Sequence, residues 1–261
     1  MAEALTFSQT ALRASWRPLL TAAVLIGMAE ASKHAGLLPV FVPSPSQVVM
    51  EIVNTPRLVT ENLAPTAWKA ALGYSIAAVI AMTAAAIAVS VRAFYGPIYN
   101  FGVMIHSVPI IATAPLLALW LGTGPQVQVV IAGLASQFPM LVGTMQGLRA
   151  ADARQRELLH VLSASRLQVL RFLLLPSALP YVFAGLKIAA PSAVLGAITA
   201  EWAGADRGVG AMMLYALFSY DTPKVWLSVF LTCFLAASGF GIWALVERFA
   251  VYWNQDVELA D

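Results

Sequence analysis

The sequence predicts an all-α integral membrane protein with about six transmembrane helices and a cytoplasmic helix-turn-helix between the fourth and the fifth. Of its 261 residues, 60% are apolar and 11% are charged, whereas soluble domains are about 45–50% apolar and about 25% charged. So few charges cannot cover a water-soluble surface of this size. The mean hydropathy of +0.78 agrees with a membrane protein.

Six apolar segments are long enough, at about 20 residues each, to cross the hydrocarbon core of a bilayer. They cover residues 18–35, 66–91, 94–121, 127–148, 179–203 and 226–249. The third is broken by Pro109 and Pro115, because a proline lacks the backbone N–H and crowds the preceding helical turn. Residues 18–253 therefore form one transmembrane domain, between an N-terminal segment 1–17 and a tail 254–261, and we expect the first apolar run to be retained rather than cleaved as a signal peptide.

The distribution of positive charge among the loops predicts the orientation of the chain. With a cytoplasmic N-terminus, the inner side carries Arg13, Arg17, Arg92, Arg149, Arg154, Arg156, Arg166, Arg171 and Arg248. The outer side then carries only Lys33, Arg57, Lys69, Arg207 and Lys224. We expect both termini in the cytoplasm and the chain in the inner (plasma) membrane.

Composition and motifs exclude several classes of protein. A net charge of +2 is too small for a nucleic-acid binder, and the single cysteine, Cys233, cannot form a disulfide framework. The sequence has neither an HExxH zinc pattern nor a GxxxxGK[ST] phosphate loop, so it predicts no metal site, no resident cofactor and no catalytic residue. Any ATP must be hydrolysed by another chain.

The loop after the first apolar segment is expected to be structured and extracytoplasmic. Pro39, Pro43 and Pro45 favour extended chain. Ser46 is expected to cap a short amphipathic helix on the membrane surface. One turn separates Glu30 from Lys33, which predicts an ion pair between them.

The most charged stretch is 149–176, between the fourth and fifth segments. Asp152 is expected to cap a helix that continues to Leu162. A break at 163–165 follows, and Ser165 is expected to cap a second helix from Arg166, ended by Pro176. The pattern fits either a helix-turn-helix held in a protein groove or an amphipathic connector lying on anionic lipid.

This stretch resembles the EAA loop, EAA-x3-G-x9-I-x-LP, of ABC-importer permease subunits. Glu157, Ser163, Leu173, Leu175 and Pro176 fall on its spacing. Leucines replace both alanines and the isoleucine, and serine replaces the glycine, although glycine would allow a positive φ that serine resists. Residues 106–124, 179–186, 201–210 and 43–45 are similar to further segments of the nitrate, sulfonate and taurine branch of the same family.

The resemblance implies a set of partners. Two permease subunits would form a homodimer around the path, two ATPase subunits that bind ATP and Mg²⁺ would lie beneath them, and an extracytoplasmic binding protein would deliver a small solute. That solute would be a nitrate-, sulfonate- or taurine-like anion or a planar vitamin-precursor-like compound. The residues implied in coupling to the ATPase are Glu157, His160, Ser163, Ala164, Ser165 and Arg166. A local pair with Arg154 or Arg156 is the alternative for Glu157.

Polar groups within the apolar segments are candidates for the translocation pathway or its gate, because burying them in a membrane is costly. His106, Ser107 and Pro109 lie in the third segment, and Pro109 frees a backbone carbonyl there. Lys187 could instead extend to the cytoplasmic face. The resemblance, rather than the local pattern, implies that Glu201 belongs to the gate.

Two other functions compete with the importer. An ion-gradient-driven secondary transporter would need an inverted repeat and a carboxylate or Na⁺ site near the midplane, and the sequence shows no internal repeat. An intramembrane enzyme using His106 with Ser107 would need both side chains on one face, but adjacent residues of a helix point about 100° apart.

Overall fold

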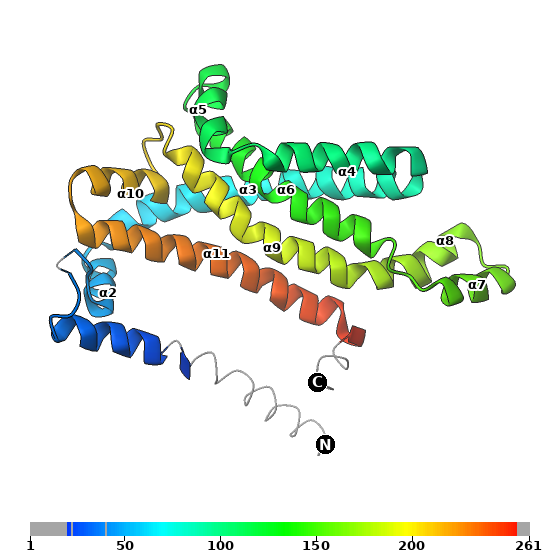
Figure 1. Cartoon of the computed structure of the whole chain (residues 1–261), viewed down its shortest axis with the longest axis horizontal. Helices are drawn as coiled ribbons and strands as arrows, with labels where there is room; N and C mark the ends of the chain where they lie inside the picture. The colour runs from blue at the N-terminus through cyan, green and yellow to red at the C-terminus, as the bar shows by residue number, and fades with distance from the viewer. Residues whose placement is uncertain (1–19, 22, 40, 255–261) are drawn as a thin grey trace, which may run out of the picture.

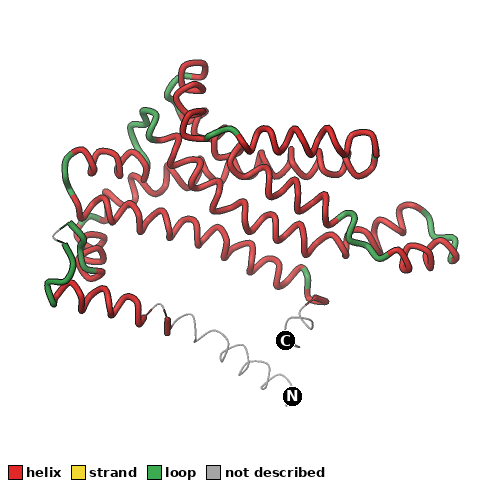
Figure 2. The backbone as a smooth tube through the Cα atoms, in the orientation of Figure 1, coloured by secondary structure: helices red, strands yellow, loops and turns green. Residues whose placement is uncertain are grey.

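The computed structural model describes residues 20–21, 23–39 and 41–254, and all regular structure among them is helical (Figures 1 and 2). The segment 1–17, the start of the first predicted span and residues 255–261 of the tail lie outside the described residues. Residues 20–21 and 23–34 are helical. The helices that follow are α2 (Pro45–Asn54), α3 (Pro56–Ser90), α4 (Arg92–Ser107), α5 (Ile110–Leu121), α6 (Pro125–Gly147), α7 (Ala153–Val161), α8 (Arg166–Val169), α9 (Leu175–Glu201), α10 (Val209–Phe218) and α11 (Thr222–Ala250).

The described helices agree with an integral membrane protein. Four are long and apolar enough to cross a membrane, namely α3, α6, the run Leu167–Glu201 that contains α9, and α11. A fifth span results if α4 and α5 are counted together. The second predicted span begins ten residues earlier than expected, at Pro56 rather than Thr66, because the polar residues before Thr66 continue the same helix.

The third predicted span is not one kinked helix. α4 and α5 are bent by 91° at the break between Ser107 and Ile110, so α5 leaves the bundle at a steep angle (Figure 1). Pro109 causes the break and lies at the N-cap of α5, whereas Pro115 stays inside that helix. The expected interruption at Pro115 is therefore wrong, since α5 continues through it.

α6 is the centre of the bundle, with α3 on one side and α9 on another. Small residues allow the close approach of α6 and α9. A Cβ on Gly143 would lie 2.7 Å from the Tyr181 carbonyl oxygen, and one on Gly185 would lie 2.6 Å from that of Pro139. Half of the buried residues of α3 are alanines: Ala70, Ala77, Ala81, Ala85 and Ala88. The bundle thus packs through backbone proximity, as membrane helices commonly do.

The bundle has two unlike ends. α7 and α8 extend beyond the others at one end, which we call the hairpin end (Figure 1). α2, α10 and the start of α11 lie at the opposite end. α2 packs against α11, and the indole N–H of Trp226 donates a hydrogen bond to the Phe41 carbonyl at 3.2 Å.

Candidate functional site

The first helix of the hairpin begins and ends as its sequence dictates. The Asp152 carboxylate accepts a hydrogen bond from the Arg154 backbone N–H at 3.0 Å, which confirms the predicted cap. At the other end Ser163 adopts a φ of +54°. The Ser163 N–H binds the His160 carbonyl and the Ala164 N–H binds the Leu159 carbonyl, each at 3.0 Å. This pair of bonds is a Schellman motif with serine at the position usually taken by glycine.

The second helix begins where predicted but does not end at Pro176. The Ser165 hydroxyl accepts from the Gln168 N–H, and the Gln168 side chain accepts from the Ser165 N–H at 2.7 Å. α8 then passes through a π-helical turn, Leu170–Leu174, into α9. In this turn the Leu175 N–H binds the Leu170 carbonyl, five residues back, so the turn is wider than that of an α-helix. The wider turn makes room for the ring of Pro176, which would otherwise crowd the carbonyl four residues before it.

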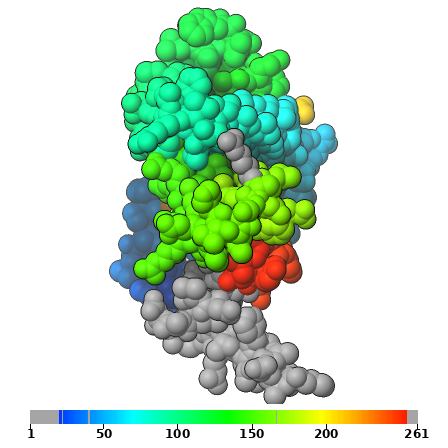
Figure 3. All heavy atoms as spheres, turned by 90° about the vertical axis from the view of Figure 1, so that its right-hand side faces the viewer, coloured from blue at the N-terminus to red at the C-terminus, as the bar shows by residue number. Residues whose placement is uncertain are grey.

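The hairpin presents an apolar surface that no other helix of the described chain covers. Leu158, Val161 and Leu162 are 59%, 78% and 66% exposed. Glu157, His160 and Ser165 are also exposed, and Ala164 is half-buried; the Arg166 side chain lies outside the description. Seen from the hairpin end, α7 and α8 lie in front of the bundle, between α4 and the end of α11 (Figure 3).

Arginines surround the base of the hairpin. Arg92 begins α4, Arg149 follows α6, and Arg171 lies in the π-helical turn. The Arg149 guanidinium stacks over the Tyr95 ring, 4.7 Å from its centroid. These three described arginines, all among the charges used to predict the cytoplasmic side, therefore gather at one end of the bundle.

His106, Ser107 and Pro109 lie together at the break between α4 and α5. The His106 ring stacks on Phe138 of α6, with 4.8 Å between ring centroids. It lines a mostly apolar cavity of about 220 Å³ beside Ile110, Thr113 and Ile131. The Ser107 hydroxyl donates to the Val103 carbonyl and so satisfies a carbonyl of its own helix.

Lys187 and Glu201 are separate from that cavity and from each other. Lys187 pairs with Glu247 of α11, with 2.5 Å between Nζ and Oε2. Glu201 lies about 21 Å further along α9, from the rise of a helix. There it pairs with Lys69 of α3, with 2.7 Å between Nζ and Oε1, and the two side chains are 0% and 4% exposed.

The sequence did not identify the side chains that complete the surroundings of Glu201. The Thr66 hydroxyl donates to its Oε1, and the Gly210 N–H donates to its Oε2, both at 2.8 Å. Thr66 also accepts from the Val209 N–H. The one feature of the sequence that could have indicated this site is Lys69, a single cation within an apolar run.

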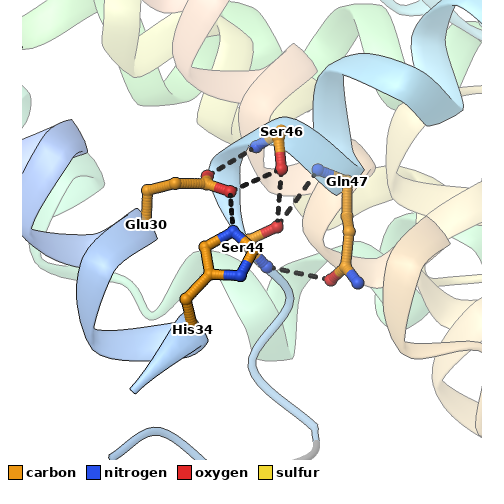
Figure 4. Close-up of polar contacts among 5 residues, drawn as sticks. All are labelled: Glu30, His34, Ser44, Ser46 and Gln47. Carbon is orange, nitrogen blue, oxygen red and sulfur yellow. Dashed lines mark hydrogen bonds and ion pairs between the residues drawn. The ribbon is translucent and has the colours of Figure 1, made fainter. Parts of the chain in front are cut away.

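A second polar cluster joins the first helix to α2 (Figure 4). The Glu30 carboxylate accepts from the Ser46 hydroxyl at 2.6 Å and from the Ser46 N–H at 3.0 Å. Ser44, not Ser46, caps α2 through a capping box with Gln47. The predicted cap was thus displaced by two residues. Glu30 binds the start of α2 and His34, while the Lys33 ammonium donates to the Pro39 carbonyl.

Comparison with known proteins decides the family. The model of the binding-protein-dependent transport system inner membrane component family matches residues 77–251. The chain belongs to this family. The matched part of this permease begins within α3 and ends after α11, so it contains the hairpin and the Lys187–Glu247 pair.

The permease is similar over most of its length to curated proteins of the same kind. The formylaminopyrimidine transport permease protein ThiX of Halalkalibacterium halodurans is 29% identical over 218 residues, which are 83% of this chain and 87% of that protein. The putative aliphatic sulfonates transport permease protein SsuC of Bacillus subtilis is 27% identical over 254 residues, 94% and 91% of the two chains. The taurine transport system permease protein TauC of Escherichia coli is 28% identical over 188 residues, 67% and 66%. The resemblance drawn from the 149–176 segment and from residues 43–45, 106–124, 179–186 and 201–210 is therefore confirmed: the chain is an ABC-importer permease of the sulfonate and taurine branch.

Proposed function

We propose that this permease moves a small solute inward and that its α7–α8 hairpin couples transport to ATP hydrolysis by a separate subunit. The observation that carries the proposal is the exposed apolar surface of the hairpin. The second helix of the hairpin, α8, runs through the π-helical turn into α9 without a break. An apolar patch at the end of a bundle, ringed by arginines, has the character of a protein-binding surface. A partner that moves the hairpin would move α9 with it.

The rest of the assembly follows from the family. The permease would act as a homodimer with two ATP-binding subunits at the hairpin end, and ATP and Mg²⁺ would bind those subunits. Because the arginines gather at the hairpin end, we assign it to the cytoplasm, together with both termini. An extracytoplasmic binding protein would then dock at the opposite end, where α2 and α10 lie.

The proposed solute is a small anion or a planar heterocycle. The named relatives transport formylaminopyrimidine, aliphatic sulfonates and taurine. His106 stacked on Phe138 offers a flat ring edge beside a cavity of about 220 Å³. Ring stacking in such a site favours planar ligands.

The test is co-purification of the tagged permease with an ATP-binding subunit from the same genome. Leu162→Asp should abolish recovery of that subunit, because it places a charge in the apolar surface of the hairpin. Leu37→Asp is the matched control: Leu37 is 76% exposed and follows the first helix. Uptake by the permease alone, driven by a proton or sodium gradient, would instead favour a secondary transporter.

A further inference from the structure

We propose that Glu201, together with Asn62 and Thr66 of α3, forms a joint that fixes the start of α10 to both α3 and α9, so that these helices move as one body. Lys69 lies in α3, and Glu201 is the last residue of α9. Both side chains are buried, at 4% and 0% exposure. The joint thus connects α3 to two consecutive elements, α9 and α10, that lie far from it in the sequence.

Side chains of α3 and α9 bind the first N–H groups of α10. The Gly208 N–H donates to Asn62 Oδ1 at 3.1 Å. The Val209 N–H donates to Thr66 Oγ1, and the Gly210 N–H donates to Glu201 Oε2, both at 2.8 Å. The first N–H groups of a helix have no partner within it. Here they are satisfied from outside, so α10 depends on α3 and α9 for its cap.

Two glycines leave room for the carboxylate. A Cβ on Gly208 would lie 2.2 Å from Glu201 Oε1, and Gly208 has a φ of +141°. A Cβ on Gly210 would lie 3.0 Å from Glu201 Oε2 and 2.5 Å from the Ile198 carbonyl oxygen. The chain around α10 is therefore shaped to bring its backbone against this one side chain.

Separating α10 from α3 or α9 would be unfavourable. It would leave the Gly210 N–H without its acceptor and disturb the buried pair beneath it. A buried charge or donor that loses its partner keeps its full desolvation cost. The Lys69 ammonium also lies 3.4 Å from the Arg207 carbonyl, so it holds the loop as well as the carboxylate.

The joint has a mechanical consequence, which rests on the proposed function. α8, the π-helical turn and α9 form one helical path from Arg166 to Glu201. Residues 202–208 could absorb movement of α9 before it reached α10. Because the joint bypasses this loop, movement at the hairpin reaches α10 at the opposite end. Lys69, Thr66 and Asn62 are positioning residues in this scheme.

Two double variants distinguish the effect of losing the hydrogen bond to α10 from the effect of losing the buried charges. Lys69→Met with Glu201→Gln removes both charges but keeps an amide oxygen for the Gly210 N–H, while the amide N–H can donate to Thr66 Oγ1. Lys69→Met with Glu201→Leu removes the charges and that acceptor. Both lack an unpaired buried ion, and apolar replacement of buried pairs is generally tolerated. They therefore differ mainly in the hydrogen bond to α10.

The first measurement is the distance between spin labels at Thr60→Cys on α3 and Leu217→Cys on α10. The labelled chain, in a Cys233→Ser background, is diluted with unlabelled chain in nanodiscs. We expect a narrow distribution for the parent and for the Gln variant. For the Leu variant we expect the detached population to rise about tenfold, as loss of roughly 1.4 kcal/mol of buried hydrogen bonding gives. A Leu variant as narrow as the parent would overturn the joint.

The second measurement is uptake per ATP hydrolysed by the complex with its ATPase and binding protein. The Gln variant should keep this ratio, and the Leu variant should lose it while basal hydrolysis and assembly persist. A purely structural role would lower assembly and leave the ratio unchanged, which would overturn the transmission. If the parent chain fails to recruit an ATPase, the proposed function falls and transmission with it, whereas the spin-label result still decides the joint.

Discussion

Lys187 of α9 and Glu247 of α11 form an ion pair in the half of the bundle nearer the hairpin, with 2.5 Å between Nζ and Oε2. The buried residues of α11 are Leu227, Ser228 and Leu231, all toward its other end. The contacts of Trp243 with Tyr74 and Phe183 accompany the ion pair. The pair is therefore a main attachment of the second half of α11.

Lys187→Met should destabilise the permease, because Glu247 would keep its charge in a half-buried place without a partner. The side chains are 22% and 24% exposed, so we expect a loss of about 1–3 kcal/mol, between exposed and fully buried pairs. Thermal unfolding in detergent measures it. Adding Glu247→Met should recover most of the loss. A single variant as stable as the parent would contradict this role.

Most features that depend on neighbouring residues could be predicted from the sequence, although the cap of α2 lies at Ser44 and not at the predicted Ser46. Features that depend on distant residues could not. The caps at Asp152 and Ser165 follow from side chains two or three residues from their donors. The partners of Lys187 and Glu201 lie on other helices, so the contacts of these two side chains could not be derived from the sequence. Pro176 shows a further limit, because a π-helical turn just before it let the helix continue.

Ser163→Gly should stabilise the hairpin. Ser163 has a φ of +54°, a conformation that costs residues with a Cβ about 1–2 kcal/mol. Glycine removes that cost, but its greater conformational freedom in the unfolded chain offsets part of the gain. We therefore expect the free energy of unfolding to rise by about 0.5–1 kcal/mol. Ser163→Val should do the opposite, because a β-branched residue is strained at positive φ. Ala164→Gly is the control, and its expected effect on the melting temperature is a small decrease.

Gly208→Ala should be strongly destabilising for two separable reasons. Its φ of +141° strains any side chain, and its Cβ would lie 2.2 Å from Glu201 Oε1. Gly204→Ala is matched in the first respect only, because Gly204 has a φ of +116° and a Cβ there would meet Thr123 at 3.4 Å. We expect about 1–3 kcal/mol from backbone strain in both and about 1–3 kcal/mol more at Gly208 from overpacking. Equal melting temperatures for the two variants would refute the tight fit around Glu201.

Glu30→Ala should loosen α2 from the first helix. It removes the acceptor of the Ser46 hydroxyl and N–H, and an anion at a helix N-terminus contributes about 0.5–2 kcal/mol. Faster hydrogen exchange in α2 would report the change. His34→Ala is the control, because the His34 side chain is 76% exposed and contacts only one oxygen of the same carboxylate. Exchange that is unchanged in Glu30→Ala would show that the contacts of α2 with α11 and α3 hold it without Glu30.

A substitution at Glu157 should change the binding of the ATP-binding subunit without changing the stability of the permease. Among the described side chains no ion pair joins it to Arg154 or Arg156, and it lies exposed on α7. Glu157→Gln should therefore leave the thermal stability of the chain within about 0.5 kcal/mol of the parent. A carboxylate paired across an interface is worth more, so affinity for the ATP-binding subunit should fall about tenfold or further. Glu61→Gln is the control at the opposite end, where Glu61 pairs with Arg57. If Glu157→Gln binds the ATPase as the parent does, the apolar surface of the hairpin must carry the contact without it.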